Sequence, residues 1–341
     1  MLSVPSHTRY GVPVASAVRD FLEKHGAESL IPFLAMSLLF AVFAITVPNY
    51  LSVLNLQQLM SDFSIPAFLA MAMAVTIFAG CIDLSIGATF AIANFVALFL
   101  VRVHGWSFAS AGLCVLGIGL AIGALNGVLV AYAKTRPFLT TLATLLILRA
   151  IYDRETDRYT AELADANYAG PVWEFLGVGK ILGIPASMIA LIVIGLALHV
   201  FLTRTRPGTH IMAVGASRKA ARHAGIPVDR VLFLAYVIGG ATTSIAGIFY
   251  AARNDSAGSD TGLGWEVTAL AAVVLGGARL SGGSGTIPRV LIGSSIAFLL
   301  VSGLLRMNAP GSLTSGLIGL VLLSAVGLST KVAEARKLSG H

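Results

Sequence analysis

Residues 203–230 read TRTRPGTHIMAVGASRKAARHAGIPVDR, and they lie between two apolar runs at 184–202 and 231–251. The stretch is basic, with six lysine and arginine residues, and it is rich in alanine and glycine. Each flanking run has roughly the 20 apolar residues that a helix needs to cross a lipid bilayer. The stretch therefore indicates a long charged loop between two membrane-spanning helices, and this decides the class of fold.

The composition of the whole chain agrees with a membrane protein. Of its 341 residues, 56% are hydrophobic and 11% are charged, whereas soluble domains carry about 25% charged residues. The net charge of +7 does not indicate nucleic-acid binding, because the basic residues are spread over short segments between apolar runs without interleaved aromatic residues. Cys81 and Cys114 lie in apolar segments without metal-binding neighbours, so we expect neither a disulfide framework nor a metal site.

The apolar runs predict an all-α polytopic membrane protein with about ten transmembrane helices. We expect the spans at residues 30–47, 58–79, 85–101, 107–132, 138–152, 184–202, 231–251, 265–278, 288–305 and 311–328. The runs at 138–152 and 265–278 have only about 15 and 14 residues. They therefore predict tilted, broken or re-entrant helices.

Lysine and arginine residues indicate the orientation of the chain. With ten spans and a cytoplasmic N-terminus, sixteen of them fall on the cytoplasmic side and seven on the outer side, as the positive-inside rule requires. The longest outer loop, 153–183, is acidic. We therefore expect both termini to be cytoplasmic, with a tail at 1–29, a membrane domain at 30–328 that includes the cytoplasmic loop 203–230, and a tail at 329–341.

The cytoplasmic loop has the features of a docking element. Residues 216–224 predict a short helix with an alanine side and a positively charged side, ended by Gly225 and Pro227. The charges could serve only to set the topology or to contact anionic lipid, but neither role needs a loop of this length with a capped helix. We expect it to insert into a cleft of a soluble partner. The expected contact residues are Gly215, Ala216, Ser217, Arg218, Ala220, Ala221, Arg222 and Gly225.

Three acidic residues lie within or at the ends of apolar runs, where a charge is costly unless it faces protein or water. Asp62 is expected at the membrane interface or hydrogen-bonded to a neighbouring helix. Asp83 lies between Gly80 and Gly87, so it belongs either to a tightly packed turn or to a functional break in a helix. Glu266 either caps the helix that it begins or lies near the outer mouth of a transport path.

A small polar patch at Gly123, Asn126 and Gly127 is either a helix-packing surface or a substrate contact. Asp83, Asn126 and Glu266 are therefore the candidate residues for a translocation path or a gate. The chain has no phosphate-binding loop with its lysine, so it should not hydrolyse ATP itself. The glycine-rich run 276–285 resembles such a loop only in composition, and it predicts a tightly packed helix junction.

Several ordered motifs resemble the permease subunits of ribose-type ABC sugar importers, and together they cover most of the chain. They are residues 80–87 (GCIDLSIG), 126–129 (NGVL), 137–142 (PFLTTL) with Arg149, 213–215 (AVG) followed by 220–226 (AARHAGI), and 265–277 (WEVTALAAVVLGG).

The resemblance implies a subunit of an ATP-driven machine in the bacterial inner membrane. Two permease chains, identical or similar, would form the pore, and a cytoplasmic ABC ATPase would bind ATP-Mg and dock on residues 203–230. A periplasmic binding protein would deliver a monosaccharide, and the permease would be neither an enzyme nor a cofactor binder. Ser217 replaces an asparagine of the family pattern and Thr268 replaces a second acid, which leaves the sugar and the docking contacts open.

Two other classes of membrane protein share an apolar, polytopic sequence of this kind. An ion-coupled secondary transporter would place coupling carboxylates near the membrane midplane, and only Asp62 and Asp83 are candidates, neither within an evident inverted repeat. A polytopic membrane enzyme would need a cluster of catalytic residues at an interface, which the sequence does not show. Both are weaker interpretations than the importer permease.

Overall fold

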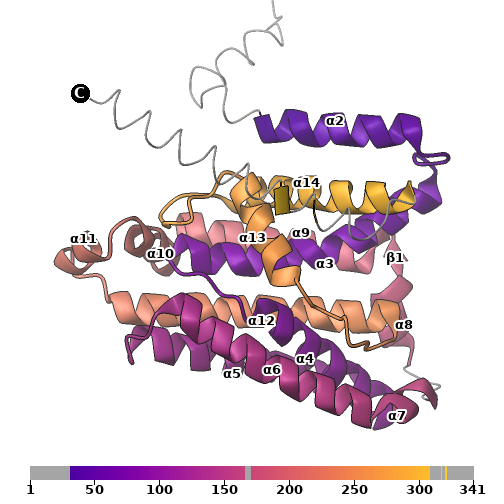
Figure 1. The fold of residues 1–341 in the computed structure, drawn as a ribbon, viewed down its shortest axis with the longest axis horizontal. Helices are drawn as coiled ribbons and strands as arrows, with labels where there is room; N and C mark the ends of the chain where they lie inside the picture. The colour runs from indigo at the N-terminus through magenta and orange to yellow at the C-terminus, as the bar shows by residue number, and fades with distance from the viewer. Residues whose placement is uncertain (1–30, 166–169, 308–315, 317–318, 321–341) are drawn as a thin grey trace, which may run out of the picture.

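The computed structural model describes residues 31–165, 170–307, 316 and 319–320, and these residues are mostly helical (Figure 1). The elements are, in order, α2 (Ile31–Thr46), α3 (Val53–Phe78), α4 (Ile86–Leu98), the π-helical turn η2 (Phe99–Val103), α5 (Phe108–Ala131), α6 (Pro137–Arg158), α7 (Thr160–Asp165), α8 (Pro171–Val178), β1 (Lys180–Ile181), β2 (Ile184–Pro185), α9 (Ala186–Arg204), α10 (Arg206–Ala216), α11 (Arg218–His223), α12 (Val228–Asn254), α13 (Trp265–Leu275) and α14 (Ile287–Arg306). The strands β1 and β2 form a small antiparallel hairpin.

The all-α membrane architecture predicted from the sequence is confirmed. Six of the described helices are long and apolar enough to cross a membrane: α3, α4 with η2, α5, α9, α12 and α14. Two shorter apolar helices, α2 and α13, match the runs predicted at 30–47 and 265–278. The tails at 1–29 and 329–341 and most of the run at 311–328 lie outside the described residues, so the count of ten spans and the orientation stay predictions.

The helix α6 differs from the prediction for residues 138–152. It is a continuous helix of 22 residues, so it is neither short nor broken, and the tilted helix that the run also allowed stays a prediction. The apolar run ends at Tyr152, but the helix continues to Arg158, and an ion pair between Arg149 and Asp153, one turn apart and 3.0 Å between Nε and Oδ1, supports this part of it. Hydropathy had marked the end of the apolar surface and not the end of the helix.

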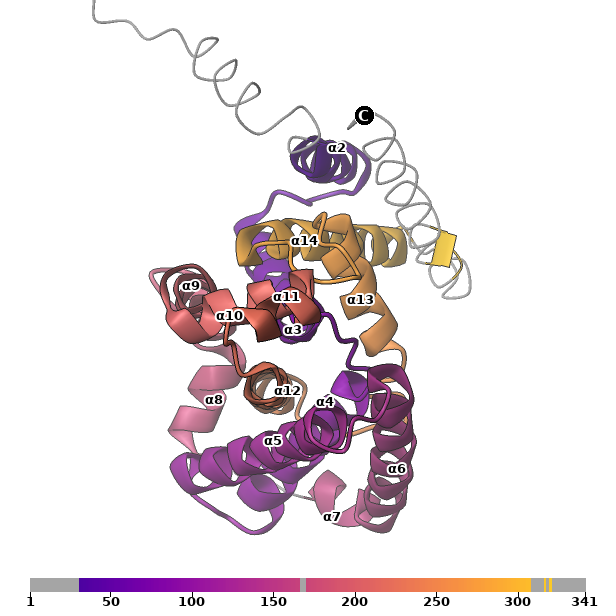
Figure 2. The same cartoon turned by 90° about the vertical axis from the view of Figure 1, so that its left-hand side faces the viewer.

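The centre of the molecule is α3, which α9, α12, α13 and α14 surround (Figure 2). Residues 67–79 at its C-terminal end are all buried. A helix that is apolar on every side is stable only when other helices cover all of its faces. The sequence of α3 therefore places it in the core.

The helices α5 and α12 approach each other closely through glycine residues. Gly119, Gly123 and Gly127 form a stripe along α5 that faces α12. A Cβ atom on Gly123 would lie 2.4 Å from the carbonyl oxygen of Tyr236, and one on Gly240 would lie 2.1 Å from the carbonyl oxygen of Gly119. These separations are too short for any side chain, so the small residues serve helix packing.

Two non-helical segments, 79–85 and 255–264, interrupt the bundle. Each leads into an apolar helix, α4 or α13, that begins inside the molecule (Figure 1). The helix α13 has 11 residues and is therefore about 16 Å long, roughly half the thickness of a bilayer core. The prediction of a broken or re-entrant segment at 265–278 matches this short helix.

Candidate functional site

The charged loop predicted at 203–230 folds into two short helices, α10 and α11, which project from one end of the molecule (Figure 1). Pro207 lies in the first turn of α10, where its missing N–H removes no helical hydrogen bond. The Thr205 hydroxyl caps this helix by accepting a hydrogen bond from the Gly208 N–H at 3.2 Å. We refer to residues 206–225 as the α10–α11 corner.

A serine divides the corner into its two helices. The Ser217 hydroxyl accepts a hydrogen bond from the Ala220 N–H at 3.2 Å and so caps α11. Gly225, with a φ of +78°, follows the last turn and allows the chain to turn away. The helix predicted at 216–224 is therefore shorter than expected and begins after Ser217.

Most of the residues predicted to contact a partner are exposed on this corner. They are Ala216, Ser217, Arg218, Ala220, Arg222 and Gly225. Two others face the chain itself: Ala221 is 4% exposed and belongs to the hydrophobic core, and a Cβ atom on Gly215 would lie 1.9 Å from the carbonyl oxygen of Phe78. Gly215 and Ala221 therefore anchor the corner, and the other six form its outer surface.

The corner is joined to the bundle through four glycine residues, Gly80, Gly215, Gly282 and Gly283, which we call the glycine junction. A Cβ atom on Gly282 would lie 2.7 Å from the Gly80 Cα, and one on Gly215 would lie 2.5 Å from the Gly283 nitrogen. The Gly283 N–H donates a hydrogen bond to the Phe78 carbonyl at 3.0 Å. The tight junction predicted for the run 276–285 is therefore present, and it joins the ends of α3 and α10.

Arg218 connects the exposed corner to the 79–85 segment. Its Nη2 donates a hydrogen bond to the carbonyl oxygen of Gly80 and contacts the Cys81 Sγ, both at 3.1 Å. Arg218 thus has an exposed side chain that also holds the start of an interior loop.

Two spanning helices hold the same loop from its other side. The hydroxyls of Thr141 on α6 and Tyr236 on α12 lie within hydrogen-bond distance of the carbonyl oxygen of Ile82, at 3.3 and 3.5 Å, and the Thr141 hydroxyl shares its proton with the Pro137 carbonyl at 3.0 Å. Tyr236 lies eight residues beyond the start of α12, which is about 12 Å along the helix axis. The 79–85 segment therefore carries irregular backbone well into the bundle, where protein must satisfy its polar groups.

A buried polar network follows this segment and contains two of the predicted path residues. The Asp83 carboxylate accepts hydrogen bonds from the Ser85 N–H at 3.0 Å and the Ser85 hydroxyl at 2.6 Å. The Asn126 Nδ2 donates to the Ser85 hydroxyl at 2.9 Å, and the Thr144 hydroxyl donates to the Asn126 Oδ1 at 2.6 Å. Asp83 and Asn126 therefore attach the start of α4 to α5 and α6.

Sequence reasoning did not identify Ser85 and Thr144 as members of this network. Both lie in or beside motifs that had been singled out, 80–87 and 137–142. An apolar helix gives no periodic signal for the face that carries a hydroxyl, so only the fold shows that Asn126 joins them.

Glu266, the third predicted path residue, makes a different contact. Its carboxylate packs against Gly87 in the first turn of α4, where a Cβ atom would lie 2.2 Å from the Glu266 Oε2. Gly262 also packs against Gly87, because a Cβ atom on Gly262 would lie 2.4 Å from the Gly87 carbonyl oxygen. The first turns of α4 and α13 therefore meet inside the bundle, and Glu266 lies where they meet.

The segment 255–264, which leads into α13, is held by side chains of other helices. Asn94 donates to the Ser256 carbonyl at 3.2 Å, Tyr152 to the Gly258 carbonyl at 2.8 Å and Arg149 to the Thr261 carbonyl at 2.7 Å. Arg102 forms an ion pair with Asp255 at 2.7 Å. The segment is thus fixed along its length.

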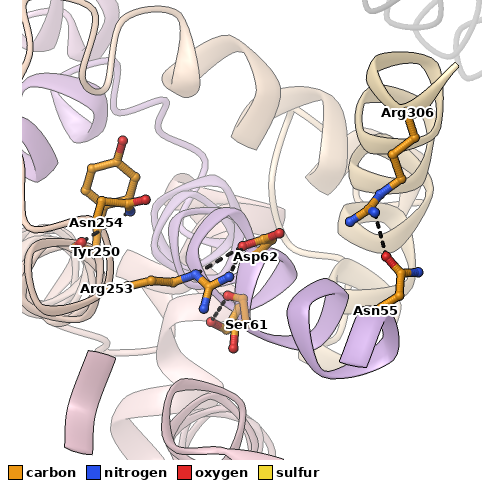
Figure 3. Close-up of polar contacts among 8 residues, drawn as sticks. Asn55, Ser61, Asp62, Tyr250, Arg253, Asn254 and Arg306 are labelled. Carbon is orange, nitrogen blue, oxygen red and sulfur yellow. Dashed lines mark hydrogen bonds and ion pairs between the residues drawn. The ribbon is translucent and has the colours of Figure 1, made fainter. Parts of the chain in front are cut away.

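A cavity of about 630 Å³ lies at the end of the bundle opposite the α10–α11 corner, between α3, α12, α13 and α14. Asp62 and Arg253 border it and form an ion pair, with the Asp62 Oδ1 at 3.1 Å from Nε and 2.5 Å from Nη2 (Figure 3). Of the two interpretations of Asp62, the structure supports the bond to a neighbouring helix. Within the part of the chain that the structure describes, no group of three or more histidine, cysteine or acidic residues could hold a metal ion.

An apolar helical bundle with interrupted helices and a charged projecting corner defines a membrane transport subunit. The chain belongs to the family described as branched-chain amino acid transport system / permease component, which matches residues 55–326. It is 33% identical over 301 residues to the ribose import permease protein RbsC of Escherichia coli (strain K12), covering 87% of this chain and 92% of that one.

Other relatives extend the comparison. The ribose import permease protein RbsC of Bacillus subtilis (strain 168) is 34% identical over 304 residues, covering 89% of this chain and 93% of that one. The fructose import permease protein FruG of Bifidobacterium longum (strain NCC 2705) is 31% identical over 314 residues, covering 89% and 92%. These relatives confirm the resemblance to ribose-type ABC permeases, and the chain is a multi-pass inner-membrane permease.

Proposed function

We propose that this chain is the membrane subunit of an ATP-driven importer that carries a monosaccharide delivered by a periplasmic binding protein. The relatives support this class of substrate, because their names specify ribose and fructose. The observation that carries the mechanism is the connection from the exposed α10–α11 corner through Arg218 to the interior 79–85 segment. The corner and both termini face the cytoplasm in this proposal, with about ten spans in the complete membrane domain.

The partner on the corner is a cytoplasmic ABC ATPase, which binds ATP-Mg. The small side chains of Ala216 and Ala220 allow close approach to a cleft, and the exposed Arg218, Lys219 and Arg222 favour an acidic rim around it. In this arrangement the permease itself is not an enzyme and binds no nucleotide or other cofactor. Its role is to convert a movement of the ATPase into a movement of helices.

Coupling follows from the contacts of the corner. A shift of α11 pulls on the Gly80 carbonyl through Arg218, and a shift of α10 presses on Phe78 through Gly215. The 79–85 segment then displaces the start of α4 through the Asp83–Ser85 contact. Such rigid movements of packed elements are the usual basis of alternating access.

A second permease copy, or a similar permease, completes the pore. Large apolar side chains are exposed on α2, α5, α6 and α9, including Ile45, Leu113, Ile147 and Leu196. In the membrane these surfaces contact lipid or the second permease. The secondary transporter is less well supported, because Asp62 is paired with Arg253 and Asp83 is bonded to Ser85.

The proposal is tested by purifying the tagged chain from its native membrane in mild detergent and identifying its companions. We expect an ABC ATPase to be recovered with the wild type, and to be lost with Arg222→Glu on the corner. The matched control is Arg154→Glu at the far end of α6, where the side chain is 78% exposed. Recovery of the chain alone, together with transport in vesicles without any ATPase, would refute the proposal and favour the secondary transporter.

A further inference from the structure

The cavity opposite the α10–α11 corner exists because α13 is short. This helix covers only about half of a bilayer core, and the 255–264 segment is held against α4 and α6 by Asn94, Arg149 and Tyr152. Among the described residues, none fills the volume beyond the first turn of α13, which Gly319 also lines. At about 630 Å³, it lies within the roughly 300–1,000 Å³ typical of small-molecule sites.

One side of the cavity is a fixed aromatic surface. Trp265 stacks on Phe90 with ring centroids 4.9 Å apart and an angle of 18° between the planes. Tyr250 meets the edges of both rings, at 5.7 Å from Trp265 and 5.1 Å from Phe90. Trp265 and Tyr250 line the cavity while Phe90 is fully buried behind them. Packed aromatic rings of this kind offer a flat apolar face without losing side-chain freedom on binding.

Next to the aromatic rings, the cavity carries hydrogen-bonding groups. Both contacts of Arg253 reach Oδ1 of Asp62, which leaves Oδ2 as an acceptor. Asn254 is exposed, and its Nδ2 donates to the Tyr250 carbonyl at 3.2 Å, which leaves its side-chain oxygen as a second acceptor. Figure 3 shows Asp62, Arg253 and Asn254 on neighbouring parts of α3 and α12. The cavity thus has a charged edge beside an apolar face.

We propose that this cavity is an outer binding site for a neutral monosaccharide. The apolar face of the sugar ring would lie on Trp265, and its hydroxyls would donate to Asp62 and Asn254 and accept from Arg253. A sugar suits the site because it has one face of C–H groups and a rim of hydroxyls. Few polar groups surround the site, so binding is weak, as a site on a transport path requires. This inference rests on the proposed import function and adds where the sugar first contacts the permease.

Binding is measured on the full chain in lipid nanodiscs through Trp265 fluorescence. Trp106→Phe and Trp173→Phe leave Trp265 as the single reporter, since the chain has three tryptophans. The probes are D-ribose, D-allose and D-fructose, and at least one of them is expected to change the emission in a saturable way. Asp62→Asn should weaken that binding at least tenfold. A chain that keeps only Trp173, which lies on α8 and is buried against α4, α5 and α12, should not respond.

A matched substitution separates the site from general effects of charge. Arg306 lies at the same end of the bundle, and its Nη1 bonds to the Asn55 oxygen on α3 rather than to a cavity residue (Figure 3). Arg306→Gln removes the same charge as Arg253→Gln. We expect only Arg253→Gln and Asp62→Asn to lower kcat/KM for uptake by the assembled importer at least tenfold, with ATPase recovery unchanged.

The outcomes distinguish an error in the outer binding site from an error in the proposed import function. One outcome would overturn the outer site and leave the import function intact. In it, a probe sugar is imported with ATP at the wild-type rate by Asp62→Asn and Arg253→Gln, and the same sugar does not change the Trp265 emission. If no ATPase is recovered and sugar uptake does not depend on ATP, the proposed import function and the site that rests on it are both overturned. Equal losses with Arg306→Gln would assign the effect to charge alone and overturn the site.

Discussion

The close packing of the glycine junction can be tested by adding a single methyl group, in the substitution Gly215→Ala. In Gly215→Ala the new Cβ atom would lie 1.9 Å from the Phe78 carbonyl oxygen and 2.5 Å from the Gly283 nitrogen. Both neighbours are backbone atoms, so relief requires α10 to move away from α3 by about 1 Å or more. Overpacking of this kind costs roughly 1–3 kcal/mol. An energy of that size corresponds to roughly 5- to 150-fold in an equilibrium between two states.

In Gly215→Ala, the coupling of ATP hydrolysis to sugar transport should weaken while the ATPase stays bound, because the exposed surface of α11 is chemically unchanged. We expect Gly215→Ala to melt at a lower temperature in detergent, to retain the ATPase, and to consume several times more ATP for each sugar imported. The assay measures ATP hydrolysis and labelled sugar uptake in the same proteoliposomes.

The control is Gly117→Ala on α5, where a Cβ atom meets no described residue within 4 Å. This change should be neutral or slightly stabilising, because alanine is favoured over glycine in a helix by about 0.5–1 kcal/mol. If Gly215→Ala and Gly117→Ala have the same melting temperature and the same ratio of ATP to sugar, the junction is not tight and the reasoning fails.

Three further predictions concern the polar contacts. Arg218→Gln should raise the ATP consumed per sugar without abolishing uptake, because it weakens the bond to the Gly80 carbonyl; an unchanged ratio would show that this bond carries no coupling. Asn126→Leu should lower the melting temperature, since the network loses two hydrogen bonds of about 0.5–1.5 kcal/mol each while Ser85 keeps Asp83 and Thr144 keeps the Thr140 carbonyl, and a melting curve like that of wild type would contradict the network. A double-mutant cycle of Asp62→Ala and Arg253→Ala should give an interaction energy of only about 1 kcal/mol or less, because both side chains are partly exposed; a value of several kcal/mol would mean a desolvated pair.

The sequence was sufficient to predict the features that depend on local pattern. The apolar runs predicted the spanning helices, and the glycine-rich run at 276–285 predicted a tight junction because only small residues allow backbones to meet. Gly80 and Gly87, on either side of Asp83, indicated the broken or tightly packed turn that the structure shows at 79–85. These signals concern the chain within a few residues, where propensity and hydropathy dominate.

Contacts between distant segments could not be predicted. Asp62 and Arg253 are 191 positions apart, and nothing in either apolar run indicates that they meet. Ala220 and Ala221 are identical in chemistry, yet one is exposed and the other is buried against the bundle. In helices that are apolar on most sides, periodicity does not show which face points inward. The cavity beside Trp265 arises from the length of α13 and the path of the segment before it, and both depend on tertiary packing.

The central claim is that the exposed face of the α10–α11 corner binds an ABC ATPase and transmits its movement. The most direct test replaces Ala220 with a photo-crosslinking amino acid in the native membrane, with the same replacement at Arg154 as the control. We expect light to join Ala220 to an ATP-hydrolysing protein, with the yield changed by ATP and with no such product from Arg154. A permease that imports sugar at the normal rate and gives no ATPase adduct from Ala220 would contradict the account.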